Sequence, residues 1–292
     1  MSATVKDPTL SIIIVNYNGE TFIEDCIDSI LSADVSFLYE VIVIDNHSQD
    51  QSLSKLAVYG DRITVVPQSQ NLGFAKANNL GVSLSAGKYI LLLNNDTIIC
   101  DNSLQMMVDY YVENPEIGLL APCLLNKDGS IQTHGSSLVS WKYKRQKVQS
   151  MSFVCGAAMM MHKVLWDELD GFDENFVFYN EDLDLCQRIR KKGHVIIYHP
   201  FIKITHLGGV STRSRPVGAM KEGFQGSLYF CRKTYSVWIY TMYRFLMLLG
   251  MVILYGVASI KRIWNPQARQ YAQMYRDMID IIIRNAVPQC SK

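Results

Sequence analysis

The sequence predicts an α/β fold with a mostly parallel central sheet flanked by helices. Short runs of consecutive apolar, β-branched residues alternate with segments in which apolar residues recur at helical spacing. The strand-like runs are apolar without interruption, which is typical of strands covered on both faces. At 292 residues, the chain is also long enough to bury one large core without disulfide staples.

The predicted strands of the first hundred residues each end at a polar or turn residue. They are residues 10–15, 41–44, 63–66 and 89–93. Between them, residues 20–31 and 74–84 carry apolar side chains three and four positions apart, as the buried face of a helix requires. Strand and helix therefore alternate as they do in parallel crossover units.

The second half of the chain is less regular. Residues 126–150 are polar and basic and predict a loop or hairpin insertion, and an apolar segment rich in small residues follows at 153–166. A helix is predicted at 183–192. A strand is predicted at 194–199, and it leads to a glycine-rich loop that contains His206.

The composition changes after Gly226, so we divide the chain into an α/β domain at residues 1–225 and a helical segment at 226–292. Residues 235–260 are almost uncharged and aromatic, interrupted by Arg244 and flanked by basic residues. This pattern favours helices that lie in or on a membrane, with the basic side chains at anionic headgroups. A membrane-spanning helix and a buried core helix are the two alternatives.

Charge and cysteine content argue against several classes of protein. The formal net charge of +1 gives no overall basic balance that would predict a nucleic-acid partner. The seven cysteines are scattered without a CxxC pair, which favours a reducing cytoplasm over a zinc site or a disulfide framework. The N-terminal residues lack the basic and apolar regions of a signal peptide, so we expect a cytoplasmic location.

Three polar clusters, at residues 16–19, 45–48 and 94–97, directly follow predicted strands. Ligands of parallel α/β sheets bind beyond the carboxyl ends of the strands, so we expect a binding site there. In the last cluster, Asp96 is a carboxylate that suits Mg²⁺ or Mn²⁺, and either ion would also bind diphosphate oxygens. A turn is the alternative interpretation of this cluster.

Glu181 and Asp182 stand where the helix at 183–192 is expected to begin. Carboxylates at this position can cap the helix, and an ionised carboxylate can also serve as a general base for a hydroxyl. His206 is a candidate metal ligand or diphosphate donor, with a purely structural histidine as the alternative.

An ordered set of motifs carries a resemblance to a known family. The motifs are SIIIVNYN at 11–18, VIVIDN at 41–46, NLGFAKANN at 71–79, LLLNNDT at 91–97, GFDENFVFYNEDLDLCQRIR at 171–190 and HLGG at 206–209. Together they resemble family 2 glycosyltransferases with the GT-A fold, which has a Rossmann-like sheet, and especially the bacterial rhamnosyltransferase-like branch. The resemblance covers roughly residues 9–215. The resemblance implies that residues 1–225 form a GT-A glycosyltransferase domain.

The resemblance implies that Asp182 is the catalytic base, with Glu181 beside it, and that Asp96 and His206 hold the metal. The substrate-binding residues that we expect are Asn16, Tyr17, Asp45, Asn71, Gly73, Phe74, Lys76, Asn94, Asn95 and Gly156. Asn94 replaces the first Asp of the family's DXD pattern, so we expect a low affinity for the free metal ion.

The implied activity is an inverting transfer of a sugar from a nucleoside-diphosphate donor to a saccharide or lipid-linked saccharide. The favoured donor is dTDP-rhamnose, and a UDP-hexose is the alternative. We expect the enzyme to build a cell-surface polysaccharide such as O-antigen at the cytoplasmic face of the membrane. The rival interpretations are a nucleotidyltransferase and a catalytically weak membrane-attached scaffold. The oligomeric state stays open, with a homodimer through the C-terminal helices as one option.

Overall fold

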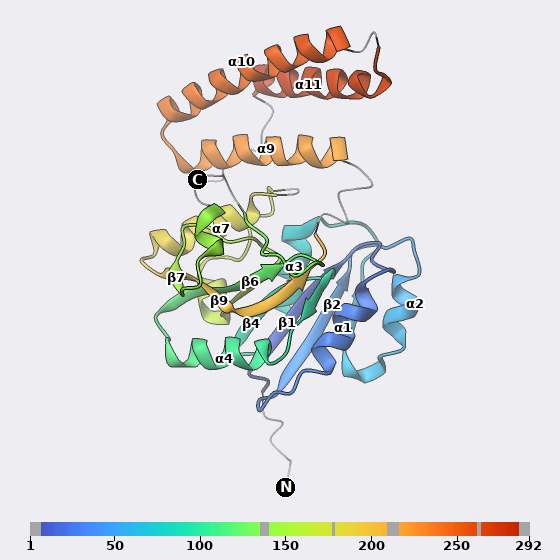
Figure 1. Ribbon diagram of the computed structural model, residues 1–292, viewed down its shortest axis with the longest axis vertical. Coiled ribbons are helices and arrows are strands. Elements are labelled where there is room, and N and C mark those ends of the chain that lie inside the picture. Colours follow the sequence, from blue (N-terminus) through green and yellow to red (C-terminus); the bar gives the residue numbers. More distant parts are fainter. Residues whose placement is uncertain (1–6, 135–139, 177–178, 209–215, 262–263, 286–292) are drawn as a thin grey trace. The chain divides into compact units, whose positions relative to one another are not determined.

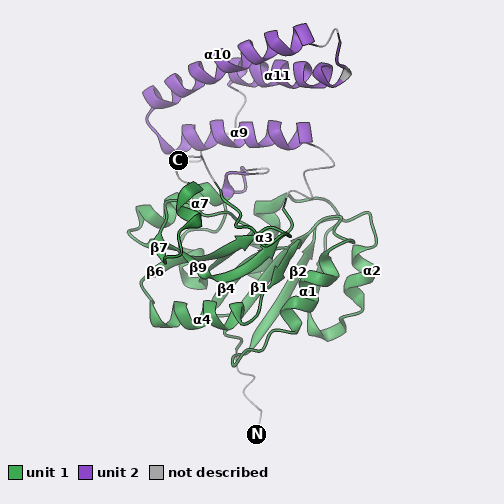
Figure 2. Ribbon diagram, in the orientation of Figure 1, with its two compact units in different colours: residues 1–173, 182–211 green, residues 174–181, 212–292 purple. Residues whose placement is uncertain are grey.

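The computed structural model describes residues 7–134, 140–176, 179–208, 216–261 and 264–285 (Figure 1). The chain forms two compact units: unit 1 comprises residues 1–173 and 182–211, and unit 2 comprises residues 174–181 and 212–292 (Figure 2). Helix α9 (Pro216–Thr234) runs without interruption through residue 225, where the sequence placed a domain boundary.

Within the described residues, unit 1 is built on a nine-stranded mixed sheet. In pairing order its strands are β3 (Thr64–Pro67), β2 (Tyr39–Asp45), β1 (Leu10–Asn16), β4 (Tyr89–Asn94), β8 (Ala158–His162), β6 (Ile117–Leu125), β9 (Val195–His206) and β5 (Thr97–Ile99), with β7 (Gln149–Ser150) beside β9. The first four strands are parallel to one another. Strand β8 is antiparallel to β4 and β6, and β6 is parallel to β9. The predicted α/β fold with a largely parallel sheet is confirmed.

Two layers of helices cover the sheet because successive side chains of a strand point to opposite faces. Ile12 and Ile14 of β1 pack in a core with α1 (Ile23–Leu31), α2 (Ser52–Ala57) and α4 (Ser103–Glu113). Ile13, between them, packs in a second core with α3 (Phe74–Ser83), α6 (Lys163–Glu168) and α7 (Glu181–Lys191). Short 3-10 helices occupy Gly60–Arg62 and Trp141–Lys144. Both faces are thus apolar, and the polar groups gather at the strand ends.

In unit 2, α9 packs with α10 (Val237–Lys261) and α11 (Pro266–Arg284) around a small apolar cluster. The buried members are Phe224, Leu228, Met274, Met278, Ile281 and Ile282. The other face of α10 is exposed and apolar; among its residues are Trp238, Met242, Phe245, Leu249, Val252 and Ile260. Among the described helices, α10 alone is long and apolar enough to cross a membrane, and 6% of its most apolar window is buried. This exposure contradicts the alternative of a buried core helix.

Arg244 interrupts the apolar sequence of α10 because it is a cap for the neighbouring helix. Its Nε donates to the carbonyl oxygen of Ile282 at 2.8 Å, and its Nη2 donates to that of Ile283 at 3.0 Å. Both carbonyl groups lie in the last turn of α11, where helical carbonyls lack partners within the helix. A cation there also interacts favourably with the helix dipole. The charge therefore points toward α11.

Candidate active site

Asn16 joins the carboxyl ends of three neighbouring strands. It is the last residue of β1, and its Nδ2 donates to Oδ1 of Asp45 at the end of β2, at 2.9 Å. Its Oδ1 accepts a hydrogen bond from Nδ2 of Asn95, which directly follows β4, at 2.8 Å. The three residues are 0%, 1% and 6% exposed. The structure thus brings three of the predicted substrate-binding residues into one buried network.

Asp45 is held at both carboxylate oxygens. The Ser48 hydroxyl donates to Oδ1 at 2.6 Å, and the Ser48 backbone N–H donates to Oδ2 at 3.0 Å. Ser48 was not among the predicted site residues. The signal that could have found it is local, because Asp and Ser side chains at turns often bond to nearby backbone groups. Tyr17, one residue after β1, is 37% exposed and accessible to a ligand.

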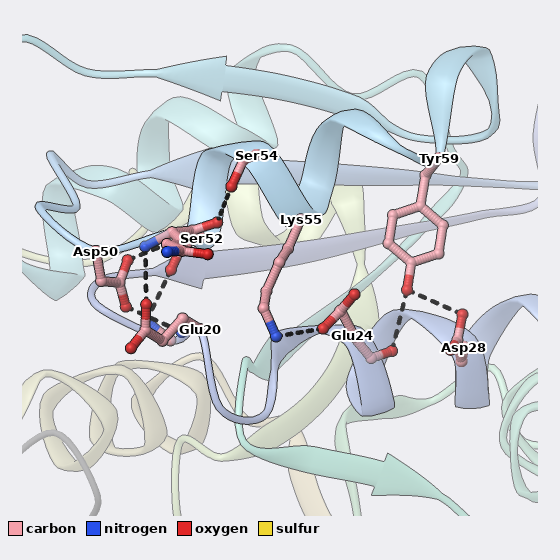
Figure 3. A network of polar contacts seen from close by, with 10 residues as sticks. Glu20, Glu24, Asp28, Asp50, Ser52, Ser54, Lys55 and Tyr59 are labelled. Atoms are coloured by element: carbon pink, nitrogen blue, oxygen red, sulfur yellow. Dashed lines mark hydrogen bonds and ion pairs between the residues drawn. The ribbon is translucent and has the colours of Figure 1, made fainter.

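The loop after β1 is clamped to the loop after β2 by reciprocal hydrogen bonds (Figure 3). The backbone N–H of Glu20 donates to Oδ2 of Asp50 at 3.0 Å, and the backbone N–H of Gln51 donates to Oε2 of Glu20 at 2.9 Å. The ion pair between Lys55 and Glu24 ties α2 to α1 in the same region. These contacts fix two of the loops that border the strand ends.

A second polar side chain after β2, Asn46, holds the loop that precedes α3. Its Oδ1 accepts from the Leu72 backbone N–H at 2.7 Å, and its Nδ2 donates to Oδ1 of Asn71 at 3.0 Å. Gly73 follows with φ of +84°, a conformation that favours glycine. Lys76, in the first turn of α3, is exposed. Asn46 thus fixes the loop that contains the predicted residues Asn71 and Gly73 and leads to Lys76.

Phe74, also predicted to bind substrate, begins α3 and is partly buried. Its ring lies 6.0 Å from that of Phe172, centroid to centroid. In this structure the side chain contributes to packing against the second core.

His206 is the last residue of β9 rather than part of the predicted loop, and it lies beside Asp96. Gln132 fixes its ring, because Nε2 of Gln132 donates to the His206 carbonyl oxygen at 2.5 Å and Oε1 faces the ring Nδ1 at 2.9 Å. With the proton on Nδ1, the ring Nε2 carries a lone pair. That atom lies 3.3 Å from Oδ1 of Asp96 and 3.3 Å from Nδ2 of Asn94.

The side chains at this point fit a divalent cation. Nε2 of His206 and a carboxylate oxygen of Asp96 converge at 3.3 Å, and both are atom types that ligate divalent cations when the imidazole is neutral. Oδ1 of Asn94 is buried and accepts no hydrogen bond from the described part of the chain. Within the described ranges, no three His, Cys, Asp or Glu side chains form a metal site. A cation held by Asp96 and His206 alone would keep coordination positions for diphosphate oxygens.

Asp182 lies in the first turn of α7 and is held by two backbone N–H groups. Gly156 donates to Oδ2 at 3.0 Å, and Leu183 donates to Oδ1 at 2.8 Å. Loss of hydration raises the pKa of Asp182 to about 6, against the opposing effect of these hydrogen bonds. A carboxyl with this pKa is ionised at neutral pH and is a stronger base than an ordinary aspartate. The predicted substrate-binding residue Gly156 therefore contacts Asp182 directly.

Glu181 is the first residue of α7 and is 6% exposed. It is the last residue of the segment 174–181, which belongs to unit 2, whereas Asp182 belongs to unit 1. The two adjacent carboxylates that the sequence paired are thus grouped with different units.

The fold is that of the GT-A glycosyltransferases. The model of the family described as glycosyl transferase family 2 matches residues 11–169, more than half of the chain, and the chain belongs to this family. The matched residues include Asn16, Asp45 and Asp96, whereas Asp182 and His206 lie beyond them.

Known relatives agree with this assignment. The chain is 21% identical over 264 residues to N-acetylglucosaminyl-diphospho-decaprenol L-rhamnosyltransferase of Mycobacterium tuberculosis, covering 78% of this chain and 86% of the relative. The solved structure of mannosyltransferase PcManGT from Pyrobaculum calidifontis with GDP-Man and Mn²⁺ is similar at a TM-score of 0.60 and 17% identity, over 96% of this chain and 88% of that one. The structure of GalNAc-T7 with UDP, GalNAc and Mn²⁺ is similar at 0.59 and 14%, over 76% and 48%. The chain resembles the rhamnosyltransferase-like branch of the family.

Proposed function

We propose that the protein is an inverting transferase that moves rhamnose from dTDP-rhamnose to a hydroxyl of a saccharide or lipid-linked saccharide during cell-surface polysaccharide synthesis. The observation that carries inversion is the Asp182 carboxylate, which two backbone N–H groups hold and whose pKa is raised to about 6. The rhamnosyltransferase relative supports the sugar and a lipid-linked acceptor. A UDP-hexose is the alternative donor.

In this proposal Asp182 takes the proton of the acceptor hydroxyl as its oxygen attacks the anomeric carbon. The bond from that carbon to the diphosphate breaks on the opposite face, so a single displacement inverts the configuration. No side chain has to form a covalent intermediate. A base whose pKa lies close to the working pH combines the ionised state with good proton affinity, which is the condition for effective general-base catalysis.

Asp96 and His206 would hold Mg²⁺ or Mn²⁺, supported by the convergence of their ligand atoms and by the Mn²⁺ in both similar structures. When bound, the ion stabilises the negative charge of the departing diphosphate as a Lewis acid. Asn16, Asp45 and Asn95 would bind and orient the nucleotide at the strand ends.

A panel of nucleotide sugars tests the function. We expect the enzyme, supplied with Mn²⁺, to release nucleoside diphosphate from dTDP-rhamnose faster than from UDP- or GDP-hexoses. Preference for a UDP-hexose would replace the donor and keep the reaction class. A protein that neither binds nucleoside diphosphates in calorimetry nor hydrolyses any donor would be a scaffold, and the proposal would then be wrong.

We also propose that unit 2 attaches the enzyme to the cytoplasmic surface of the membrane through the exposed face of α10. That face is an unbroken helical stripe of large apolar side chains, while Arg244 points to α11. Basic residues precede the helix at Arg232 and Lys233 and end it at Lys261. Such charges attract anionic lipid headgroups. A lipid-linked acceptor would favour this location, because enzyme and substrate would share one surface.

Vesicle sedimentation tests the attachment. We expect the protein to pellet with vesicles containing phosphatidylglycerol. Joint substitution of Phe245→Ser and Leu249→Ser should lower the partition coefficient tenfold or more, since each buried apolar side chain contributes about 1.5–3 kcal/mol. The matched control is Val58→Ser with Leu38→Ser, which are 69% and 55% exposed in unit 1. If the protein is instead a dimer that stays in the supernatant with vesicles present, α10 pairs with a second copy of the chain.

A further inference from the structure

The chain segment directly before Asp182 belongs to the helical unit. Residues 174–181 group with residues 212–292, and the chain returns to unit 1 at Asp182 (Figure 2). Of this segment, residues 174–176 and 179–181 are described. The general base of the proposed reaction is therefore the first residue after a segment that groups with α9.

Several contacts hold this stretch against one face of α9. The ring of Phe176 lies 4.9 Å from that of Tyr229 at an interplanar angle of 68°, and both residues are 2% exposed. Nζ of Lys233 lies 5.8 Å from the centroid of the Phe176 ring. Nearer to Asp182, Nδ2 of Asn180 donates to the carbonyl oxygen of Gly223 at 3.0 Å.

Gly226 permits the closest approach between α9 and this stretch. A Cβ atom at this position would lie 2.6 Å from Nδ2 of Asn180 and 2.9 Å from the backbone oxygen of Tyr179. The second of these atoms belongs to the backbone, so rotation of a side chain cannot relieve the clash. A glycine inside a helix costs about 1 kcal/mol relative to alanine. Helix stability therefore does not explain Gly226, whereas the close approach does.

The backbone at this point is in an unusual conformation. Tyr179 and Asn180 have φ of +66° and +73°, two consecutive non-glycine residues in the left-handed region. Such residues cost about 1–3 kcal/mol each and persist where the surroundings determine the conformation. Contact with α9, through Gly226 and through the hydrogen bond to Gly223, provides these surroundings.

We propose that α9 is a positioning element for the general base: Gly226 and Asn180 fix the backbone that leads into Asp182, and thereby the position of its carboxylate. This inference rests on the proposed function. The influence of α9 would reach Asp182 through the peptide chain, because Asn180 is two residues from Asp182. Catalytic rates are sensitive to such placement, and a shift of about 1 Å can cost on the order of 100-fold.

Gly226→Ala tests the proposal, with Gly250→Ala in α10 as the matched control. Both substitutions place a methyl group in a helix of unit 2, but a Cβ at Gly250 meets nothing within 4 Å. We expect Gly226→Ala to lower kcat about tenfold to 100-fold. The donor KM and the dissociation constant of the nucleoside diphosphate should stay within about twofold of wild type, since the proposed nucleotide-binding residues lie at the ends of β1, β2 and β4. Gly250→Ala should match wild type in kcat, in the donor KM and in the dissociation constant of the nucleoside diphosphate.

Asn180→Asp is the second variant, and it tests the positioning role of α9 if Gly226→Ala does not fold. Aspartate has the same size and also tolerates the left-handed region, but it replaces the donor that faces the Gly223 carbonyl with an acceptor. It should show the same selective loss of kcat. Equal kcat in Gly226→Ala and Gly250→Ala, or a parallel loss of kcat and nucleotide affinity, would overturn the inference. A wild-type enzyme without turnover of any nucleotide sugar would instead contradict the proposed function.

Discussion

Asp182→Asn is expected to lower kcat by on the order of 10²–10⁴, the usual contribution of a general base. Asparagine keeps the size of the side chain and an oxygen that can accept the hydrogen bond from Gly156, but it cannot take a proton from the acceptor. Nucleoside-diphosphate affinity should stay within about twofold of wild type, because a group that acts only in the transition state contributes little to ground-state binding. Steady-state kinetics with calorimetry on the same preparations measures both.

The pH profile provides an independent readout of the same residue. Only the ionised carboxylate is a base, so wild-type kcat should rise with pH through about 6, the pKa to which desolvation brings Asp182. Burial raises the pKa of the neighbouring Cys186 and Tyr143, so both stay uncharged in this range. The acid limb should therefore disappear from the residual activity of Asp182→Asn.

Asp184→Asn is the control on the same helix. Asp184 is 2% exposed and pairs with Arg188 at 2.7 Å, so its loss should lower the melting temperature. The acid limb near pH 6 should remain. Near-normal turnover by Asp182→Asn, or an acid limb that survives in it, would show that another group is the base.

Much of unit 1 was predictable because β1, β2 and β4 are largely buried on both faces. The uninterrupted apolar runs located β1, β2 and β4, and their parallel arrangement placed the polar residues that follow them at one edge. Strand β6 escaped prediction although most of it is buried. It contains Pro122, which argues against a central strand in a sequence. The register shift in its pairing with β9 at Pro122/Cys123 shows how the sheet accommodates the proline.

The parts that the sequence did not reveal depend on contacts between distant residues. Gln132 orients His206 across 74 positions, and no local pattern connects an amide in a loop to a histidine at a strand end. Likewise, in the sequence Arg244 is only a break in an apolar segment. Its contact with the last carbonyls of α11 explains why a charged residue stands there. Local periodicity predicts elements, whereas the partners of polar groups follow from the tertiary structure.

Asp96→Asn is expected to abolish the effect of Mn²⁺ on nucleotide binding. The substitution removes the carboxylate at the candidate metal site, where Asn94 already provides an amide in place of a second carboxylate. Nucleoside-diphosphate affinity measured with Mn²⁺ should then fall to the value measured without the metal. If Asp96 and His206 are the metal ligands, wild type should bind the free ion only weakly and bind it well together with the diphosphate.

His206→Gln, with His199→Gln as its control, separates metal binding from folding. Both histidines lie on β9 and are 8% exposed, so their replacement should affect stability to a similar extent. Only His206 faces Asp96, and only its loss should weaken Mn²⁺-dependent binding of the nucleotide. Gln132→Leu should have a smaller effect of about 10–100-fold, because it releases the ring without removing the ligand. Unchanged Mn²⁺ dependence in both Asp96→Asn and His206→Gln would place the ion elsewhere and leave these side chains a structural role.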